Sequence, residues 1–186
     1  MTRMTSFFAI AAVVLLAGCT ASDNGRSPTS TANADTGMQA HVILGSASGS
    51  NVSGKLSFAS TDQGVRITGR IDELKPNSTH GFHIHENGDC GAPDASSAGG
   101  HFNPAQQPHG HPDSKPHHAG DIPNQHADAS GVATVDVTDP DIELGTGTDD
   151  DVLGRALIVH AQPDDYSSQP SGNAGPRIAC GVITRN

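Results

Sequence analysis

The sequence predicts an all-β domain built as an antiparallel sandwich or flattened barrel. Apolar residues occur in short runs, several of which alternate with polar residues, as strands with one buried face do. The chain also contains 22 glycines and 12 prolines, which is typical of many turns. No stretch has the apolar spacing of a long helix. Short strands separated by turns, without helices between them, favour packed antiparallel sheets.

The strand segments follow one another from residue 39 to the C-terminus. Segment 65–71 alternates most clearly, with Val65, Ile67 and Ile71 on one face and arginines on the other. Segment 155–160, RALIVH, is mostly apolar and is therefore expected to be buried. A long loop is expected after residue 86 and a second one over 162–175. The expected strands are 42–44, 52–58, 65–71, 80–86, 132–137, 155–160 and 177–183.

The first 38 residues predict an export signal followed by a tether. Residues 1–19 combine Arg3 with an apolar core that is too short to span a membrane. The segment ends in LAGC, which resembles the bacterial lipobox and implies cleavage before Cys19 and a lipid on its thiol. Acyl chains there would anchor the protein to a membrane of the cell envelope. A plain secretory signal cleaved nearby is the alternative. Residues 20–38 are small, polar and aperiodic, which predicts a flexible linker to the domain at 39–186.

Charge and cysteine count narrow the partners and the compartment. The net charge of -10 argues against nucleic acid as a partner. Of the three cysteines, Cys19 belongs to the signal, which leaves Cys90 and Cys180 in the domain. A cysteine pair in an exported chain favours a disulfide over two buried thiols.

Residues 81–121 carry the strongest functional signal. Imidazole is the usual protein ligand of zinc and copper, so a transition-metal site is the first hypothesis. His83 and His85 would share one face of a strand. Asp121 ends the stretch with a carboxylate, another zinc ligand. Seven of the 11 histidines lie in this stretch, namely His83, His85, His101, His109, His111, His117 and His118.

The motifs GFHIHE, GGHFNP, HG followed by a proline, and HAGD resemble the metal-site motifs of the copper–zinc superoxide dismutases. The resemblance continues with LIVH at 157–160 and GNAGPRIACGVI at 172–183, and it covers roughly residue 39 to the C-terminus. It implies a Greek-key fold of about eight strands with two long functional loops. It also implies disproportionation of superoxide to dioxygen and hydrogen peroxide by a redox-cycling copper, as antioxidant defence in the cell envelope. With the lipobox, the chain resembles a bacterial lipoprotein-type member.

The resemblance also implies a role for each matching residue. His101 would bridge a copper to a structural zinc and carry a proton during turnover. Arg177 would attract the anion, the alternative being a surface ion pair. Asp164 would join a copper histidine to a zinc histidine, the alternative being a surface aspartate. Cys90 and Cys180 match the family disulfide. The implied copper ligands are His83, His85, His101 and His160, and the implied zinc ligands are His101, His109, His118 and Asp121.

Other features stay open. The HAGD pattern selects His118 over His117, and His41, His80, His111 and His126 are interpreted as structural or surface residues. The loop at 165–175 lacks lysine, so steering of the anion would come from elsewhere, with Lys115 and Arg155 as unfavoured options. Three other functions compete, namely metal storage without turnover, a copper-only enzyme and a purely structural lipoprotein. A homodimer is possible, since no motif marks the interface.

Overall fold

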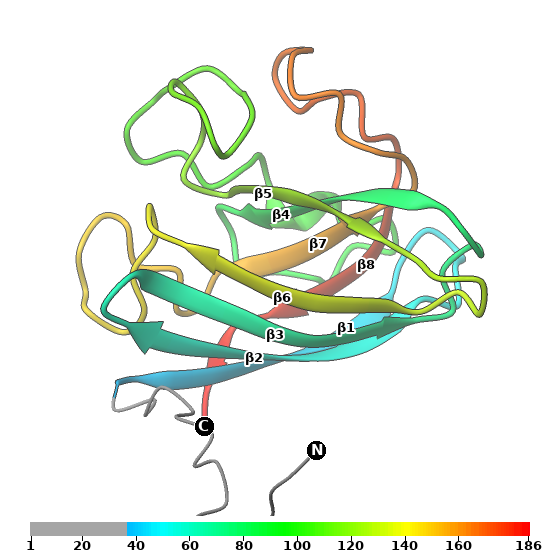
Figure 1. The fold of residues 1–186 in the computed structure, drawn as a ribbon, viewed down its shortest axis with the longest axis horizontal. Coiled ribbons are helices and arrows are strands. Elements are labelled where there is room, and N and C mark those ends of the chain that lie inside the picture. Colours follow the sequence, from blue (N-terminus) through cyan, green and yellow to red (C-terminus); the bar gives the residue numbers. More distant parts are fainter. Residues whose placement is uncertain (1–36) are drawn as a thin grey trace, which may run out of the picture. The chain divides into compact units, whose positions relative to one another are not determined.

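Eight antiparallel strands form one continuous sheet that curls into a nearly closed barrel, as the computed structural model of residues 37–186 shows (Figure 1). The predicted all-β class is therefore confirmed. The hydrogen-bonded order is β5-β4-β7-β8-β1-β2-β3-β6, and a short β9 pairs with β1. The predicted signal, Cys19 and the linker up to residue 36 lie outside the described residues. The strands are β1 (Gln39–Ser46), β2 (Ser53–Thr61), β3 (Gly64–Asp72), β4 (Thr79–His85), β5 (Asp121–His126), β6 (Ala133–Asp139), β7 (Ala156–His160), β8 (Arg177–Val182) and β9 (Thr184–Arg185).

The chain crosses three times between the two walls of the barrel, after β3, after β5 and after β6. β6 pairs with β3 and β7 pairs with β4, so neither strand forms a ladder with its predecessor in sequence. These crossovers give the Greek-key connection. β5 and β6 are the two ends of the path and contact each other without ladder pairing, which leaves one seam in the barrel.

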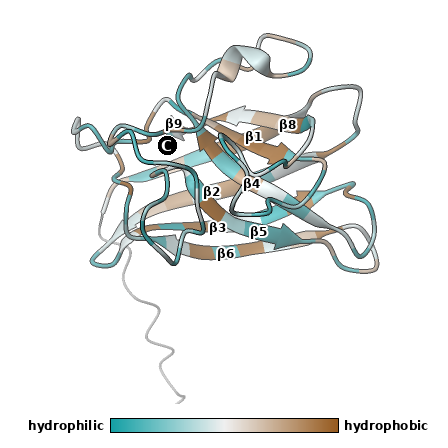
Figure 2. Cartoon of the chain, turned by 90° about the horizontal axis from the view of Figure 1, so that it is seen from above, coloured by the Kyte–Doolittle hydropathy of each residue, from teal (hydrophilic) through white to brown (hydrophobic). Residues whose placement is uncertain are grey.

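The core follows the alternation of the sequence. Val65, Ile67 and Ile71 of β3 are buried, whereas Arg66 and Arg70 of the same strand face solvent. The hydropathy colouring shows the same banding along the strands (Figure 2). β7 is buried along its whole length, as its apolar sequence predicted. Within residues 37–186 no helix is long and apolar enough to cross a membrane, and the helical content is the single 3-10 turn Ser96–Ala98.

The sequence reading missed β5, which it assigned to loop. The sequence of β5, DIPNQH, has no apolar alternation and contains Pro123, which cannot donate to a ladder. β5 tolerates this proline because it is an edge strand that pairs on one side only, with β4. β5 positions Asp121. Because the prediction lacked this strand, it placed Asp121 at the end of a loop.

A buried carboxyl group lies at the end of β6, beside the seam. Asp139 is 8% exposed, and its Oδ1 accepts a hydrogen bond of 2.9 Å from the amide of Asp141. Burial raises the pKa of Asp139 to about 7, and the charges of Asp141 and Asp121 add to this against the opposing effects of the Asp141 amide and Lys115. The folded protein therefore holds a proton on Asp139 at a pH where the unfolded chain has released it.

The variant Asp139→Asn is expected to change how stability depends on pH. A raised carboxyl pKa stabilises the fold at low pH, and this contribution is lost as pH rises from about 4 to about 7. Asparagine keeps the acceptor but cannot ionise. As pH rises through that window, the free energy of unfolding of Asp139→Asn should increase relative to that of the wild type by up to about 1.4 kcal/mol per pH unit. Urea titrations of both proteins across the window measure this, and a difference that does not change with pH contradicts it.

Candidate metal centre

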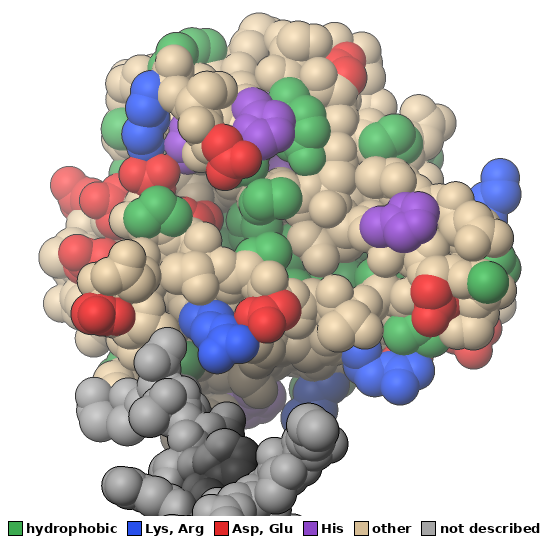
Figure 3. Space-filling view, in the orientation of Figure 1, with side chains coloured by type: hydrophobic (Ala, Val, Ile, Leu, Met, Phe, Trp, Pro, Cys, Tyr) green, Lys and Arg blue, Asp and Glu red, His purple; other side chains and the backbone are tan. Residues whose placement is uncertain are grey.

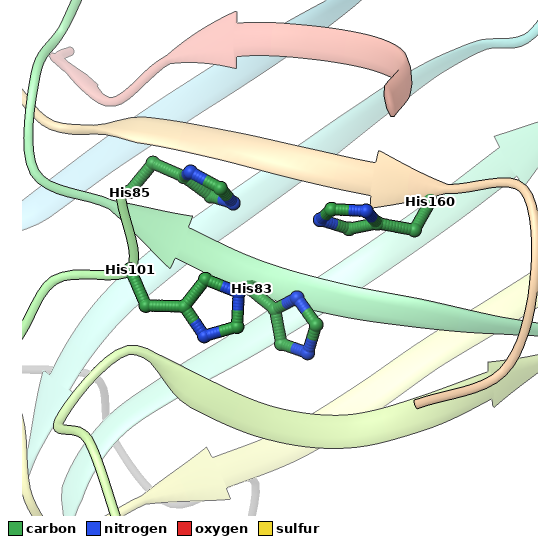
Figure 4. Close-up of side chains that lie close together, drawn as sticks. All are labelled: His83, His85, His101 and His160. Atoms are coloured by element: carbon green, nitrogen blue, oxygen red, sulfur yellow. The ribbon is translucent and has the colours of Figure 1, made fainter. Parts of the chain in front are cut away.

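Four histidines from two strands and a loop meet on the outer side of β4. His83 and His85 alternate along β4 with Phe82 and Ile84, which belong to the apolar core. β7 pairs with β4 and ends at His160. His101, in the loop that follows β4, forms an isolated backbone β-bridge with His85. All four rings are buried and face a common space (Figure 4). Their nitrogens lie within 4.8 Å of one another, so they can hold one metal ion.

A second group lies on the other side of His101. Here the Nδ1 atoms of three imidazoles surround the carboxylate of Asp121 at the start of β5. The distances to Asp121 oxygens are 2.7 Å for His101, 3.0 Å for His109 and 3.3 Å for His118. These four residues also satisfy the 4.8 Å spacing and are buried. His101 thus belongs to both groups and offers a different nitrogen to each.

Whether each imidazole nitrogen has a hydrogen-bond partner indicates whether metal ions fit the two groups. Buried polar atoms are nearly always hydrogen-bonded, and leaving one unpaired costs about 1–3 kcal/mol. Six histidines in the two groups nevertheless each have one buried nitrogen without a hydrogen-bond partner. Metal ions at the two groups would satisfy all of these atoms, so the residues fit copper and zinc. The atoms are Nδ1 of His83, His109 and His118, and Nε2 of His85, His101 and His160.

The opposite nitrogens are fixed by hydrogen bonds. Asp164 joins the two groups, because Nε2 of His83 lies 2.7 Å from its Oδ2 and Nε2 of His109 lies 2.9 Å from its Oδ1. His85 Nδ1 contacts the Gly99 carbonyl at 3.0 Å, and His160 Nδ1 contacts the Gly175 carbonyl at 3.1 Å. Such contacts determine which nitrogen of a ring is free for a metal.

Gly172 makes room for the Asp164 link. Its φ is +64°, and a Cβ there would lie 1.8 Å from Oδ1 of Asp164 and 2.8 Å from Nε2 of His109. The glycine therefore serves both a left-handed backbone and close packing against the two groups.

The variant Asp164→Asn is expected to weaken metal retention about 10- to 100-fold. The amide can accept from one imidazole, but its NH₂ group would face the N–H of the other. Competition with a chromophoric chelator measures both metals. Asp149→Asn is a matched control, because this residue is an exposed aspartate of the loop at 140–155. Equal retention of both metals in Asp164→Asn and wild type contradicts the prediction.

Burial keeps three of these imidazoles neutral at neutral pH, the state in which a ring nitrogen can bind a metal. Burial, followed by the neighbouring histidines, lowers the pKa of His101 to about 4 and of His160 to about 3. The pKa of His85 is also far below its usual range, first through burial. Against burial, the nearby carboxylates of Asp121 and Asp164 raise the pKa of His109 to about 9. Both carboxylates are ionised at neutral pH and would offset the charge of a divalent ion.

Arg177 borders the first group. It is the cross-strand partner of His160, and its guanidinium donates to the Ala95 carbonyl at 2.7 Å and the Gly99 carbonyl at 2.6 Å. Burial lowers the pKa of Arg177, yet an arginine stays charged at neutral pH. The predicted disulfide is confirmed, with Cys90 and Cys180 joined across a Cα–Cα distance of 5.8 Å.

The remaining histidines and cations have other contacts. The set of His83, His85, His101 and His160 is called the copper-type group below, and the set of His101, His109, His118 and Asp121 the zinc-type group. His117 is buried beside the zinc-type group, with Nδ1 2.7 Å from the His118 carbonyl and Nε2 3.2 Å from Asp141 Oδ2. Half-buried His41 contacts Asn186, exposed His126 contacts Thr79, and His111 packs on Tyr166. Lys115 pairs with Asp141, and Arg155 donates to the Glu86 carbonyl and covers the Phe102 ring.

The sequence reading missed one supporting contact. Buried His80 places Nδ1 2.7 Å from the carbonyl of His160 and thus holds the backbone of a candidate ligand. The only available signal was its position three residues before His83, which is too weak to separate it from a core histidine. The carbonyls of Gly99 and Gly175 carry no side-chain signal.

Comparisons with known proteins agree with this geometry. The sequence model of the family described as Copper/zinc superoxide dismutase (SODC) matches residues 52–183. Superoxide dismutase [Cu-Zn] 1 of Aquifex aeolicus (strain VF5) is 42% identical over 149 residues, covering 78% of this chain and 88% of that protein. Among solved structures, a SOD-like protein from Bacillus subtilis has a TM-score of 0.70 at 42% identity, covering 77% and 97% of the two chains. The clock protein EA4 has a TM-score of 0.73 at 35% identity, covering 81% and 96%.

Proposed function

Because this chain belongs to the copper/zinc superoxide dismutase family, we propose that it is an active superoxide dismutase with both metal sites in use. Copper would be held by His83, His85, His101 and His160, and zinc by His101, His109, His118 and Asp121. The observation that carries this proposal is the set of six imidazoles with one unpartnered, buried nitrogen each, arranged as two groups that share His101. Retention of the whole zinc-type group disfavours a copper-only enzyme.

The residues of the chain have separate tasks in the reaction. When bound, copper supplies the one-electron redox couple, while zinc has no redox chemistry and serves structure. Disproportionation then converts two superoxide anions and two protons into dioxygen and hydrogen peroxide. Nδ1 of His101 lies against Asp121, so the ring keeps its place while Nε2 takes up or gives up a proton. Asp164 and the Gly99 and Gly175 carbonyls hold His83, His109, His85 and His160 in fixed orientations.

Arg177 is expected to attract the substrate anion. Its guanidinium lies beside His160 in a protein of net charge -10, so it provides a local positive field. The variant Arg177→Ala should lower the second-order rate constant about tenfold and weaken its dependence on ionic strength. Pulse radiolysis at several salt concentrations measures both. Arg66→Ala is the control, since Arg66 of β3 pairs with Asp136 of β6 on the opposite wall of the barrel. Equal losses in the two variants would contradict the prediction.

The test of the proposed function is superoxide decay on the protein loaded with copper and zinc. Decay should be much faster than with the zinc-only protein, and faster than with equal free copper in the presence of a chelator. Metal content is measured on the same samples. Protein that binds both metals but leaves superoxide decay unchanged would overturn the enzyme proposal and leave metal storage as the function.

We further propose that the protein is a lipoprotein of the cell envelope, anchored through Cys19. The support is the LAGC sequence after a short apolar run, because Cys19 lies outside the described residues. Mass spectrometry of the N-terminal peptide from the native host tests this. A diacylated Cys19 supports the proposal, and an unmodified cysteine or a cleavage site elsewhere rejects it.

A further inference from the structure

A cavity of about 380 Å³ lies at the seam of the barrel, between β5 and β6. Its apolar walls come from Ile122 and Pro123 of β5, Val137 of β6, and Pro112 and Pro140 in the loops. The face of the molecule in Figure 3 shows acidic side chains gathered beside apolar ones. The other lining residues are polar or charged, and a cavity of this size that combines apolar walls with polar groups can hold a small molecule. Both metal groups lie elsewhere, so this cavity is not part of the candidate metal centre.

Asp139 is the buried carboxyl of the cavity, whose other polar lining residues are Asp113, Ser114, Lys115, Thr138 and Asp141. One of its oxygens accepts the amide of Asp141, and within residues 37–186 the other has no hydrogen-bond or ion-pair partner. The residue is 8% exposed, so its carboxyl group as a whole has little contact with water. A mostly buried carboxyl beside apolar walls is a group that a cation with an apolar body would complete. The same burial is the main cause of the raised pKa of Asp139.

The neighbouring charges distinguish Asp139 from Asp141 at the cavity wall. Asp141 is already compensated, because Lys115 Nζ lies 2.7 Å from its Oδ1 and His117 Nε2 lies 3.2 Å from its Oδ2. Lys115 does not reach Asp139 as an ion-pair partner. Among the acidic lining residues of the described part of the chain, Asp139 is therefore the buried one that no ion pair neutralises, whereas Asp113 is exposed to solvent.

A metal ion fits this cavity less well than an organic cation. Within residues 37–186, only the two groups of the metal centre bring three or more ligand atoms within 4.8 Å of one another. Calcium and magnesium require six or more oxygen ligands or several retained waters, whereas the carboxylates that line this cavity do not converge on one point. An alkylammonium needs one carboxylate and an apolar surface.

We propose that this cavity binds a small primary alkylammonium. Its ammonium group pairs with the free oxygen of Asp139, and its alkyl chain packs against Ile122 and Val137. Ile122 directly follows Asp121, and the loop over the cavity runs on to His118. A bound amine would therefore also fix the segment that carries two candidate zinc ligands.

The test is calorimetric titration of the full, metal-loaded chain with n-butylammonium chloride, against sodium chloride as the blank. Saturable binding at one site per chain is expected. The uncharged n-butanol should bind at least about tenfold more weakly, because a hydrogen bond to a charged group contributes about 1.5–3 kcal/mol. Calcium chloride should give no saturable heat.

Two variants locate the site. Asp139→Asn should weaken butylammonium binding about 10- to 100-fold, whereas the exposed-site control Asp149→Asn should leave it unchanged. Val137→Phe narrows the cavity and should weaken butylammonium more than methylammonium. Circular dichroism of each variant verifies its fold. Equal binding of butanol and butylammonium, unchanged affinity in Asp139→Asn, absence of saturable binding, or calcium binding that depends on Asp139 would each overturn the proposal.

Discussion

The variant His160→Ala is expected to lose superoxide disproportionation by more than about a hundredfold while it still binds zinc. His160 belongs to the copper-type group only, and its Nε2 is one of the nitrogens that no hydrogen bond satisfies. Residues that merely orient ligands alter metal affinity by about 10- to 100-fold, so loss of a ligand itself should exceed that range. The zinc-type group shares no atom with His160, which explains why zinc should remain.

The measurement combines superoxide decay with metal analysis of the same preparation. His126→Ala is the matched control, because His126 is an exposed histidine whose ring forms a hydrogen bond with Thr79, away from both metal groups. The control should retain wild-type activity and both metals. Activity within a few-fold of wild type in His160→Ala would mean that copper is not held by this group.

The double variant Cys90→Ser with Cys180→Ser is expected to lose about 4 to 5 kcal/mol of stability. The bond joins residues 90 positions apart, and cross-linking such a long loop removes much conformational entropy from the unfolded chain. Activity should fall as well. The loop that the disulfide ties to β8 supplies the Ala95 and Gly99 carbonyls that hold Arg177.

Urea unfolding of the metal-free protein measures the stability change without a contribution from metal binding. The disulfide-bonded wild type treated with a reductant should approach the double variant, which separates loss of the bond from the effect of two serines. A change below about 1 kcal/mol would show that the unfolded chain is already compact in this region.

Much of the fold and the centre could be predicted from the sequence, for identifiable physical reasons. Alternation in β3 and the apolar run of β7 follow directly from burial, so these strands were located within a few residues. The histidines of β4 were placed on one face by the same rule. β5 was missed because an edge strand pairs on one side and accepts Pro123.

The contacts that could not be predicted from the sequence join a side chain to a backbone carbonyl or to a residue distant in sequence. The contact of His80 with the His160 carbonyl is an example. Residue type alone does not reveal such partners, because every residue has a carbonyl. The seam cavity arises in the same way, since Asp139 meets Ile122 only once the barrel curls.

The Gly99 carbonyl accepts hydrogen bonds both from Nδ1 of His85 and from the guanidinium of Arg177. One peptide unit thereby sets the distance between a candidate metal ligand and Arg177, the residue proposed to attract the anion. The segment from the disulfide to Gly99 should consequently tolerate many changes of side chain but few changes of length. During divergence of the family, an insertion or deletion there would displace both partners together, so related sequences should keep the length of this segment even where its composition drifts.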